Sequence, residues 1–353
     1  MKKILALFIL IILTCGCAFH KKEDEPMNKS GIDVLPLMSS ESIYNNRIWV
    51  GTFQLVWNDL MDEVVKGDVE FIGGTPDVVK GLNKQEFKAS DLSENSYYKT
   101  WGEASPELKK AIVKGIKEKF NETSDILNSI DWTPAPSKYV IYAMLKKDFK
   151  FLKAFDKLEP AQFGYIETKV DYFGIKPQNR DVLGENIDVL FYENKNDFAV
   201  KLYTQGNDVV YLYRTDEDRT FDKTYADMIL KSQKYEGRKW FGTGDYFKVP
   251  DLKLYQEASF KEVCGKPIKG TDFMIDKALE TVDFNMNNEG VKLKSEAVII
   301  TKLTSAGLGH VLEPRYFNFD STFYLFLQEK DKNQPYYAMR VDDVITYTQT
   351  ARK

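Results

Sequence analysis

The sequence predicts an α+β fold, and three kinds of segment support this prediction. Residues 53–64 and the stretch after Ser105 repeat apolar residues at helical spacing. Several short stretches alternate apolar and polar residues, as half-buried strands do. Residues 139–145 are apolar at every position, as in a strand that is buried on both faces of a sheet. With 43% hydrophobic and 29% charged residues, the 353-residue chain can build a sizeable core.

The first seventeen residues have the pattern of an export signal. Lys2 and Lys3 precede an apolar run, residues 4–13, that is too short to span a bilayer comfortably. The run ends in Thr-Cys-Gly-Cys, which resembles the lipid-attachment site of bacterial lipoproteins. This resemblance implies that Cys17 carries the acyl chains, palmitate among them, and anchors the protein to the extracytoplasmic face of the cell membrane. Cys15 is a competing site, and a plain secretory signal is the alternative.

A polar segment separates this signal from the rest of the chain. Residues 18–40 are rich in charge, and they are expected to form a tether that joins the anchor (1–17) to one folded domain (41–353). The formal net charge of −4 argues against a partner that is a nucleic acid. Within the folded part Cys264 is the one cysteine, so no intrachain disulfide is expected there, and Cys264 is predicted to be a small core residue.

The first half of the domain is predicted to contain a strand, two helices and a buried strand. Residues 46–50 form the first strand, and the helix over 53–64 is followed by Gly67 as a stop signal. Residues 73–76 are a turn without the lysine and spacing of a phosphate-binding loop. The clearest helix starts at Ser105, which is followed by proline at the first helical position. Its apolar face consists of Leu108, Ile112, Ile116 and Phe120.

The second half is predicted to be mainly strands. Three of them form a meander at residues 187–192, 198–203 and 209–213, followed by a helix over 221–230 and an extended segment over 245–254. Two further strand regions, 281–290 and 316–341, flank a middle stretch. It consists of residues 291–302 and a glycine-punctuated segment, residues 303–314. The sequence alone leaves open whether this middle stretch pairs as a strand or forms a loop.

Few residues could support catalysis. The chain has two histidines, His20 in the tether and His310 in the glycine-punctuated stretch, so histidine-based catalysis would depend on His310. No cluster has the spacing of a zinc or calcium site. A pair of carboxylates that meets in space remains the one enzymatic alternative, although no residue argues for it. The protein is therefore not expected to be an enzyme or to need a metal or a cofactor.

An ordered series of segments resembles the serpin family. Residues 284–290 (Phe-Asn-Met-Asn-Asn-Glu-Gly) resemble the strand that leads to the hinge glycine of the reactive loop, although Asn288 and Glu280 replace usual family residues. The other matching segments are the helix after Ser105 and residues 139–145, 151–155, 317–326 and 335–341. The resemblance covers residues 105–341. It implies a serpin-like α+β fold, in which helices pack on a large mixed β-sheet beside smaller sheets.

The resemblance also implies a reactive loop that a serine or cysteine protease cleaves. Its hinge would comprise Glu289, Gly290, Val291 and Leu293. Its scissile region would comprise Lys302, Leu303, Thr304 and Ser305, with the bond after Thr304 as the family-style position. In this family the cleaved loop inserts as a new strand, which is a known case of strand addition, and so traps the protease.

Side-chain parity after Gly290 is compatible with insertion but does not require it. Alternate residues from Val291 to Thr301 are small or apolar and could face a buried sheet surface. Leu293 is bulkier than the alanine that inhibitory members prefer, which favours slow insertion. The same alternation fits a fixed, half-buried strand. Two interpretations stay open: a monomeric, lipid-anchored protease inhibitor, or a non-inhibitory surface lipoprotein that binds a ligand or a protein partner.

Overall fold

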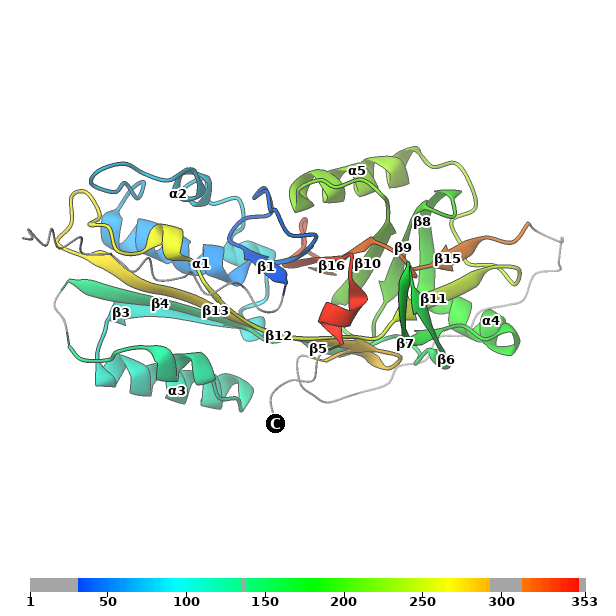
Figure 1. Ribbon diagram of the computed structural model, residues 1–353, viewed down its shortest axis with the longest axis horizontal. Coiled ribbons are helices and arrows are strands. Elements are labelled where there is room, and N and C mark those ends of the chain that lie inside the picture. The colour runs from blue at the N-terminus through cyan, green and yellow to red at the C-terminus, as the bar shows by residue number, and fades with distance from the viewer. Residues whose placement is uncertain (1–30, 135–136, 293–312, 349–353) are drawn as a thin grey trace, which may run out of the picture.

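The computed structural model describes residues 31–134, 137–292 and 313–348. These residues form an elongated body with three β-sheets (Figure 1). Three helices surround a six-stranded mixed sheet in one half of the body, and the other two sheets lie in the second half. The predicted α+β class is confirmed. No helix in the described part of the chain is both long and apolar enough to cross a bilayer.

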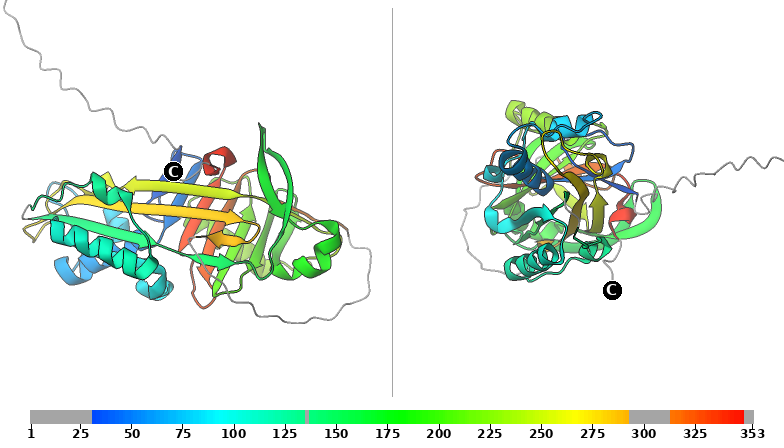
Figure 2. Two further views of the ribbon diagram at one scale, coloured as in Figure 1. Left: turned by 90° about the horizontal axis from the view of Figure 1, so that it is seen from below. Right: turned by 90° about the vertical axis from the view of Figure 1, so that its left-hand side faces the viewer.

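The mixed sheet has the strand order β3-β4-β13-β14-β5, and β12 pairs with the other side of β13. Strands β4 and β13 are parallel, whereas every other pair in this sheet is antiparallel. Figure 2 shows β12 and β13 running side by side from one half of the body into the other. The strands are β3 (Tyr97–Glu103), β4 (Lys138–Leu145), β5 (Asp148–Lys150), β12 (Leu252–Ser259), β13 (Met274–Asn287) and β14 (Gly290–Lys292).

Helices cover both faces of this sheet (Figure 1). Helix α1 (Thr52–Asp59) continues into a π-helical turn, Leu60–Val65, and packs on one face close to α2 (Asp77–Leu82). Helix α3 (Pro106–Phe120) packs on the opposite face, and the Ser105 hydroxyl oxygen accepts a hydrogen bond of 3.1 Å from the Leu108 N–H, as the capping pattern predicted. Because β4 lies between these layers, residues 139–145 are apolar on both faces.

The second sheet has seven strands in the order β1-β2-β17-β16-β10-β9-β8. Helix α5 (Phe221–Lys234) packs on it, with Phe221 against Tyr324 and Tyr225 against Phe326. These elements confirm the predicted strand over 46–50, the predicted meander over 187–213 and the predicted helix over 221–230. The strands are β1 (Ile32–Leu35), β2 (Asn46–Val50), β8 (Ile187–Asn194), β9 (Asp197–Tyr203), β10 (Asp208–Arg214), β16 (Phe323–Glu329) and β17 (Tyr337–Val341).

A third, four-stranded sheet lies beside α4 (Arg180–Leu183) at the far end of the body (Figure 1). The order of its strands is β15 (Tyr316–Asn318), β11 (Tyr246–Pro250), β7 (Ile166–Gly174) and β6 (Asp156–Phe163). Short 3-10 helices connect elements throughout the body. They span Ala89–Asp91, Glu94–Ser96, Asp125–Ser129, Pro177–Asn179, Gly184–Asn186, Lys261–Val263 and Val344–Tyr347.

Two sequence-based expectations need correction. Strand β1 lies within the predicted tether of residues 18–40, because Ile32 is fully buried and pairs with Asn46 of β2. The folded domain therefore begins before residue 41; a short apolar alternation beside a charged stretch hid this strand. The helix after Phe53 ends at Lys66 in a left-handed conformation (φ 57°) instead of at Gly67.

Cys264 was predicted to be a small core residue. It packs against the hydrophobic cluster around α1, but it is only partly buried.

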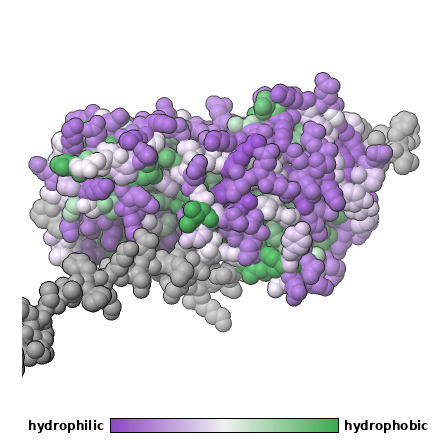
Figure 3. Space-filling view, turned by 45° about the horizontal axis from the view of Figure 1, so that its top comes forward, coloured by the Kyte–Doolittle hydropathy of each residue, from purple (hydrophilic) through white to green (hydrophobic). Residues whose placement is uncertain are grey.

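The surface is mostly polar on the face that Figure 3 shows. Hydrophobic residues form small, separated groups between hydrophilic ones. Large exposed apolar side chains include Ile43 before β2 and Ile72 before α2, which lie on separate loops. Single exposed hydrophobic residues of this kind are normal for a protein surface. On this face, polar clefts are therefore better candidates for binding than an apolar patch.

Candidate functional site

The candidate hinge lies where β13 turns back on itself. Asn288 and Glu289 form the turn, and β14 then pairs antiparallel with the end of β13, Val291 opposite Met286. On its other side β14 pairs antiparallel with β5, Val291 opposite Phe149. Glu289 is exposed, whereas Val291 is fully buried. The other predicted site residues lie outside the described residues, namely Cys17, Leu293, Lys302, Leu303, Thr304 and Ser305.

Gly290 is required by the close approach of β5. A Cβ atom at this position would lie 2.2 Å from the carbonyl oxygen of Phe149 and 2.7 Å from the Cα of Lys150. Both contacts are to backbone atoms, so a side chain would push β14 away from β5. The glycine that the sequence comparison singled out therefore has a direct steric role.

An aromatic segment far away in the sequence holds the turn. The Phe151 N–H donates to the Glu289 carbonyl oxygen (2.9 Å), and the Phe155 N–H donates to that of Asn288 (2.8 Å). The Asn288 amide donates in return to the Phe155 carbonyl oxygen (3.2 Å). The rings of Phe151 and Phe155 are buried against Phe173. The turn is thus fixed by backbone hydrogen bonds to a packed aromatic cluster.

Next to the hinge, β4 and β13 pair directly with each other. This parallel seam extends from Lys138 opposite Met274 to Met144 opposite Thr281. Beyond Leu145 the chain leaves β13 and reaches β5 after two lysines, and β14 occupies the space that opens. The sheet is therefore forked: two strands are paired at one end, and a third strand lies between their continuations at the other end.

A buried ionic network lies at the fork. The Lys147 ammonium is 2.5 Å from a carboxylate oxygen of Glu329 and 2.8 Å from one of Asp208. Glu329 is fully buried and accepts hydrogen bonds from the Ser93 N–H and hydroxyl, and the Tyr336 hydroxyl donates to Asp208 (2.9 Å). Although burial opposes ionisation, the hydrogen bonds from Lys147 and Ser93 hold the pKa of Glu329 below its usual value.

A second buried acid, Glu280, lies in the seam itself. The Thr52 hydroxyl, at the start of α1, donates to its Oε1 (2.7 Å), and its Oε2 has no hydrogen-bond partner among the described residues. Burial raises the pKa of Glu280 to about 8, so the side chain is neutral at pH 7. Its strand partners are Ala143 of β4 and Ala258 of β12. Sequence comparison marked Glu280 as a departure from the family pattern but gave no hint of this environment.

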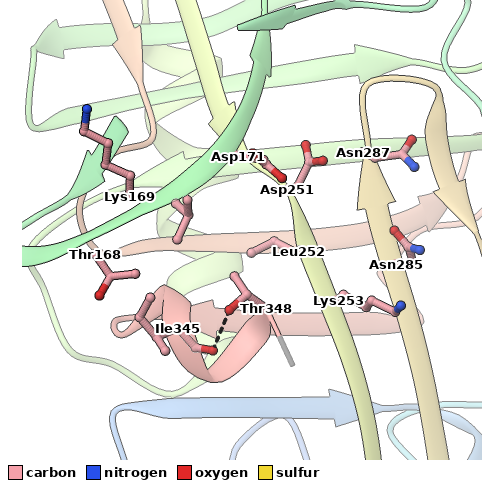
Figure 4. Close-up of a pocket in the computed structure, with 11 residues that line it drawn as sticks. Thr168, Lys169, Asp171, Asp251, Leu252, Lys253, Asn285, Asn287, Ile345 and Thr348 are labelled. Carbon is pink, nitrogen blue, oxygen red and sulfur yellow. Dashed lines mark hydrogen bonds between the residues drawn. The ribbon is translucent and has the colours of Figure 1, made fainter. Parts of the chain in front are cut away.

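A polar cavity of about 400 Å³ adjoins the hinge end of β13 (Figure 4). The Asp171 and Asp251 carboxyl groups lie next to one another, and Asn285 and Asn287 project from β13. Burial and the negative charge of Asp171 raise the pKa of Asp251 to about 6. The cavity suits a polar or cationic ligand. Its lining residues are Thr168, Lys169, Val170, Asp171, Asp251, Leu252, Lys253, Asn285, Asn287, Ile345 and Thr348.

Metal ligation has little support in the described ranges. Within 31–134, 137–292 and 313–348, no group of three histidine, cysteine, aspartate or glutamate side chains is placed to hold an ion. The site thus consists of backbone pairing, a buried ionic network, a buried acid and a polar cavity. None of these arrangements aligns a nucleophile with a base.

Comparisons with solved structures identify the fold. The mouse protein-Z-dependent protease inhibitor is similar over 85% of this chain and 91% of its own chain, with 14% identity and a TM-score of 0.51. Serpin48 from the insect Tenebrio molitor shows 13% identity over 84% of this chain and 91% of its own, with a TM-score of 0.49. Human kallistatin shows 8% identity over 85% and 92%, with a TM-score of 0.49. Neither family models nor curated protein sequences give a match.

The architecture and the first of these comparisons agree with the sequence resemblance. The protein is of the α+β class in which a large mixed sheet, covered by helices, is joined to two further sheets. It is serpin-like: the chain has the serpin fold.

Proposed function

We propose that the protein is an exported, lipid-anchored protease inhibitor that acts by loop cleavage and strand insertion. One observation carries this proposal: β14 lies antiparallel between β13 and β5, directly next to the parallel β4–β13 seam. A strand that continues β14 in the same direction would enter that seam. In this proposal β14 would be the start of the insertion path, and it would be present before any cleavage.

The register of β14 defines what an inserted strand would contact. Lys292 pairs with Asn285, so the same register continued along β13 would set Ser295 opposite Val282 and Ala297 opposite Glu280. Insertion would replace one parallel ladder with two antiparallel ladders, which pair more favourably per residue. Leu293 and Ile299 would lie on the same face of the inserted strand as Val291 and would be buried. Burial of each side chain would stabilise the inserted state by roughly 1.5–3 kcal/mol. Antiparallel pairing and apolar burial would therefore both favour the inserted state.

The trapping reaction would proceed through the acyl-enzyme. The protease nucleophile would attack a carbonyl carbon between Lys302 and Ser305, the peptide bond would break, and the new amino terminus would leave as an amine. Insertion would then carry the ester- or thioester-linked protease along the sheet before water could hydrolyse the link. A basic residue at Lys302 suits a trypsin-like protease, and by its name the mouse neighbour is also a protease inhibitor.

The proposal predicts a covalent complex with a serine or cysteine protease. When the mature protein is incubated with a panel of such proteases, electrophoresis in detergent should show a stable adduct. Cleavage within residues 302–305 should also raise the melting temperature, because the cleaved strand would extend the sheet. Ser295→Asp should abolish the adduct but not the cleavage, because this position would face the sheet interior opposite buried Val282.

Lys294→Gln is the matched control, because it also lowers the net charge by one but would lie opposite the exposed Asp283. It should leave the adduct intact. Clean cleavage of the native protein, without an adduct or a rise in melting temperature, would contradict inhibition. That result would favour the alternative, a non-inhibitory binding protein, and the cavity beside Asn285 and Asn287 would be the first place to seek its ligand.

Lipid attachment at Cys17 is part of the same proposal and has its own measurement. The sequence motif supports it. Metabolic labelling of cells with radioactive palmitate should label the native protein and the Cys15→Ser variant, but not Cys17→Ser. Label that remains on Cys17→Ser and disappears from Cys15→Ser would assign the anchor to Cys15. Absence of label from all three proteins would favour a plain secretory signal.

A further inference from the structure

Strand β3 forms one edge of the six-stranded sheet, in the half of the body that contains α1 and α3 (Figure 1). It pairs with β4 and has no strand on its other side in the described part of the chain. Just before the strand, the Ser96 carbonyl oxygen accepts a hydrogen bond from the Lys146 N–H (2.8 Å). Just after it, the Ala104 N–H donates to the Lys138 carbonyl oxygen (3.0 Å). The even-numbered residues of β3 therefore turn their backbone groups towards β4, and the odd-numbered residues turn theirs away.

Three residues make up the open edge. The backbone N–H and carbonyl groups of Lys99, Trp101 and Glu103 point away from β4 and have no hydrogen-bond partner among the described residues. At the start of the strand, the Tyr97 N–H already donates to the Glu94 carbonyl oxygen. At its end the chain turns into α3. Trp101 is therefore the midpoint of the open edge.

This edge lacks the features that usually protect an edge strand. The ladder between β3 and β4 continues without a bulge from Tyr97 to Glu103, and β3 contains no proline. Its one lysine, Lys99, is ion-paired with Asp59 of α1, so the ammonium is partly neutralised. Bulges, prolines and unpaired lysines are the common means by which proteins keep another strand from adding to an edge. The edge of β3 is thus open to pairing.

A row of aromatic rings leads inwards from the same edge. The Trp101 ring stacks on that of Tyr139 in β4, with 5.9 Å between the ring centroids. The Tyr139 ring in turn contacts that of Phe273, with 4.3 Å between centroids. All three side chains are only half-buried. Aromatic residues are enriched in protein interfaces, so the edge combines unpaired backbone groups with an apolar contact surface.

From these observations we infer that β3 is the interaction surface for a second copy of this chain. The two β3 strands would pair antiparallel about a two-fold axis at Trp101, which uses every open backbone group of the edge. Lys99 of each copy would then lie opposite Glu103 of the other, on the same face of the joined sheet. The interface would gain two pairs of opposite charge and a pair of tryptophans. A two-fold interface requires a self-complementary surface of this kind.

The charges of β3 distinguish this register from its neighbours. An axis at Lys99 would set two ammonium groups opposite each other, and an axis at Glu103 would do the same with two carboxylates. An axis at Thr100 or Gly102 would form no pair of opposite charge. The surface therefore favours a dimer of one register over the monomer expected from the sequence. Since β3 lies on the side of β4 away from β13, the dimer does not depend on loop insertion.

Cysteine cross-linking in cells that make the full chain tests this register. In a Cys264→Ser background, a short bifunctional thiol reagent should join Trp101→Cys to its own copy, because position 101 would lie opposite itself. Lys99→Cys and Glu103→Cys should each give little product when made alone, since either position would lie about 13 Å along the strands from its own copy. Coexpression of these two variants should give a product, and this pair keeps the tryptophan.

The mass of the product decides what occupies the edge. A product of two chains is the expected result. A product of any other mass would assign the edge to a different protein, and equal cross-linking at all three positions would indicate random collision. Absence of product from both Trp101→Cys and the coexpressed pair would show that the edge is not an interface. Each of these three outcomes would overturn the proposal.

The variant Glu103→Lys measures the contribution of charge to the dimer. It would set lysine opposite Lys99 twice, so the dissociation constant of the dimer, measured by sedimentation equilibrium of the mature protein, should rise about tenfold. The exposed Glu103 is the last residue of β3, so the melting temperature should change little. Glu167→Lys is the matched control, because it makes the same charge change at an exposed position of β7. Equal weakening by both variants would reduce the effect to net charge and contradict the proposed register.

Discussion

Replacing Lys147 with methionine is expected to lower the free energy of unfolding by about 3–5 kcal/mol, because it leaves buried carboxylates without their counter-charge. Methionine keeps the unbranched stem but removes the ammonium that contacts both Glu329 and Asp208. Glu329 is fully buried and would have to stay ionised without a cation or take up a proton. This cost should exceed that of losing any surface ion pair of the protein.

Urea unfolding of Lys147→Met beside Lys146→Met measures this effect. The neighbouring Lys146 contacts Glu122 (3.2 Å) and donates a hydrogen bond to the Phe120 carbonyl oxygen (2.5 Å). Lys146 and Glu122 are both more exposed than Lys147, so the replacement of Lys146 should cost only about 1–2 kcal/mol. Adding Glu329→Gln to Lys147→Met should recover part of the loss, because the unpaired charge disappears. Equal losses for the two lysine variants would contradict the assigned role of the network.

Raising the pH from 5 to 9 is expected to destabilise the protein by about 4 kcal/mol through Glu280 alone. The folded-state pKa of about 8 lies above the ordinary value of 4.5, so the folded protein binds more protons than the unfolded chain between these values. The contribution of Glu280 to the free energy of unfolding is therefore fully present below pH 4.5, declines between pH 4.5 and about 8, and is lost above pH 8. Desolvation of the carboxylate causes the shift, and the Thr52 hydrogen bond only partly offsets it.

The variant Glu280→Gln removes the contribution of Glu280 to the pH dependence of stability. Glutamine cannot ionise, and its amide oxygen can still accept the hydrogen bond from Thr52. The free energy of unfolding, measured by urea titration at several pH values, should decline with pH in the native protein and should be much flatter in the variant. At pH 9 the variant should be the more stable of the two. Parallel pH profiles would show that Glu280 titrates normally. Asp251, with a pKa of about 6, affects both proteins alike.

Much of the fold could be predicted where local pattern and burial agree. Residues 139–145 are apolar throughout because β4 lies between two helical layers, and the helix after Ser105 carries its own cap and apolar face. Strands β6 and β7 were missed because half of the residues of β6 are solvent-exposed and the strand contains Pro160, so no clean alternation remains. Strand β3 was missed for a similar reason, since most of its residues are only half-buried.

The candidate site was less accessible to sequence reasoning. Gly290 and Val291 emerged from an ordered family resemblance, and the close approach of β5 now gives Gly290 a steric reason. The partners of Lys147 could not be predicted, because Glu329 lies almost two hundred residues away and reads locally as a surface acid. The pKa of Glu280 depends on burial beneath α1, which no local pattern encodes. Long-range packing, which composition and periodicity do not report, created both features.

The position of β2 in the seven-stranded sheet constrains the order of folding. Strand β2 is made early in synthesis, yet its antiparallel neighbour, β17, lies near the other end of the chain, with Trp49 opposite Ala338. One edge of β2 therefore stays open until almost the whole chain is available, and such non-local pairing is slow. An open edge of this kind is a template for wrong pairing with other chains. The chain thus gains its seven-stranded sheet in one late step, and the delay between synthesis and closure sets its exposure to aggregation.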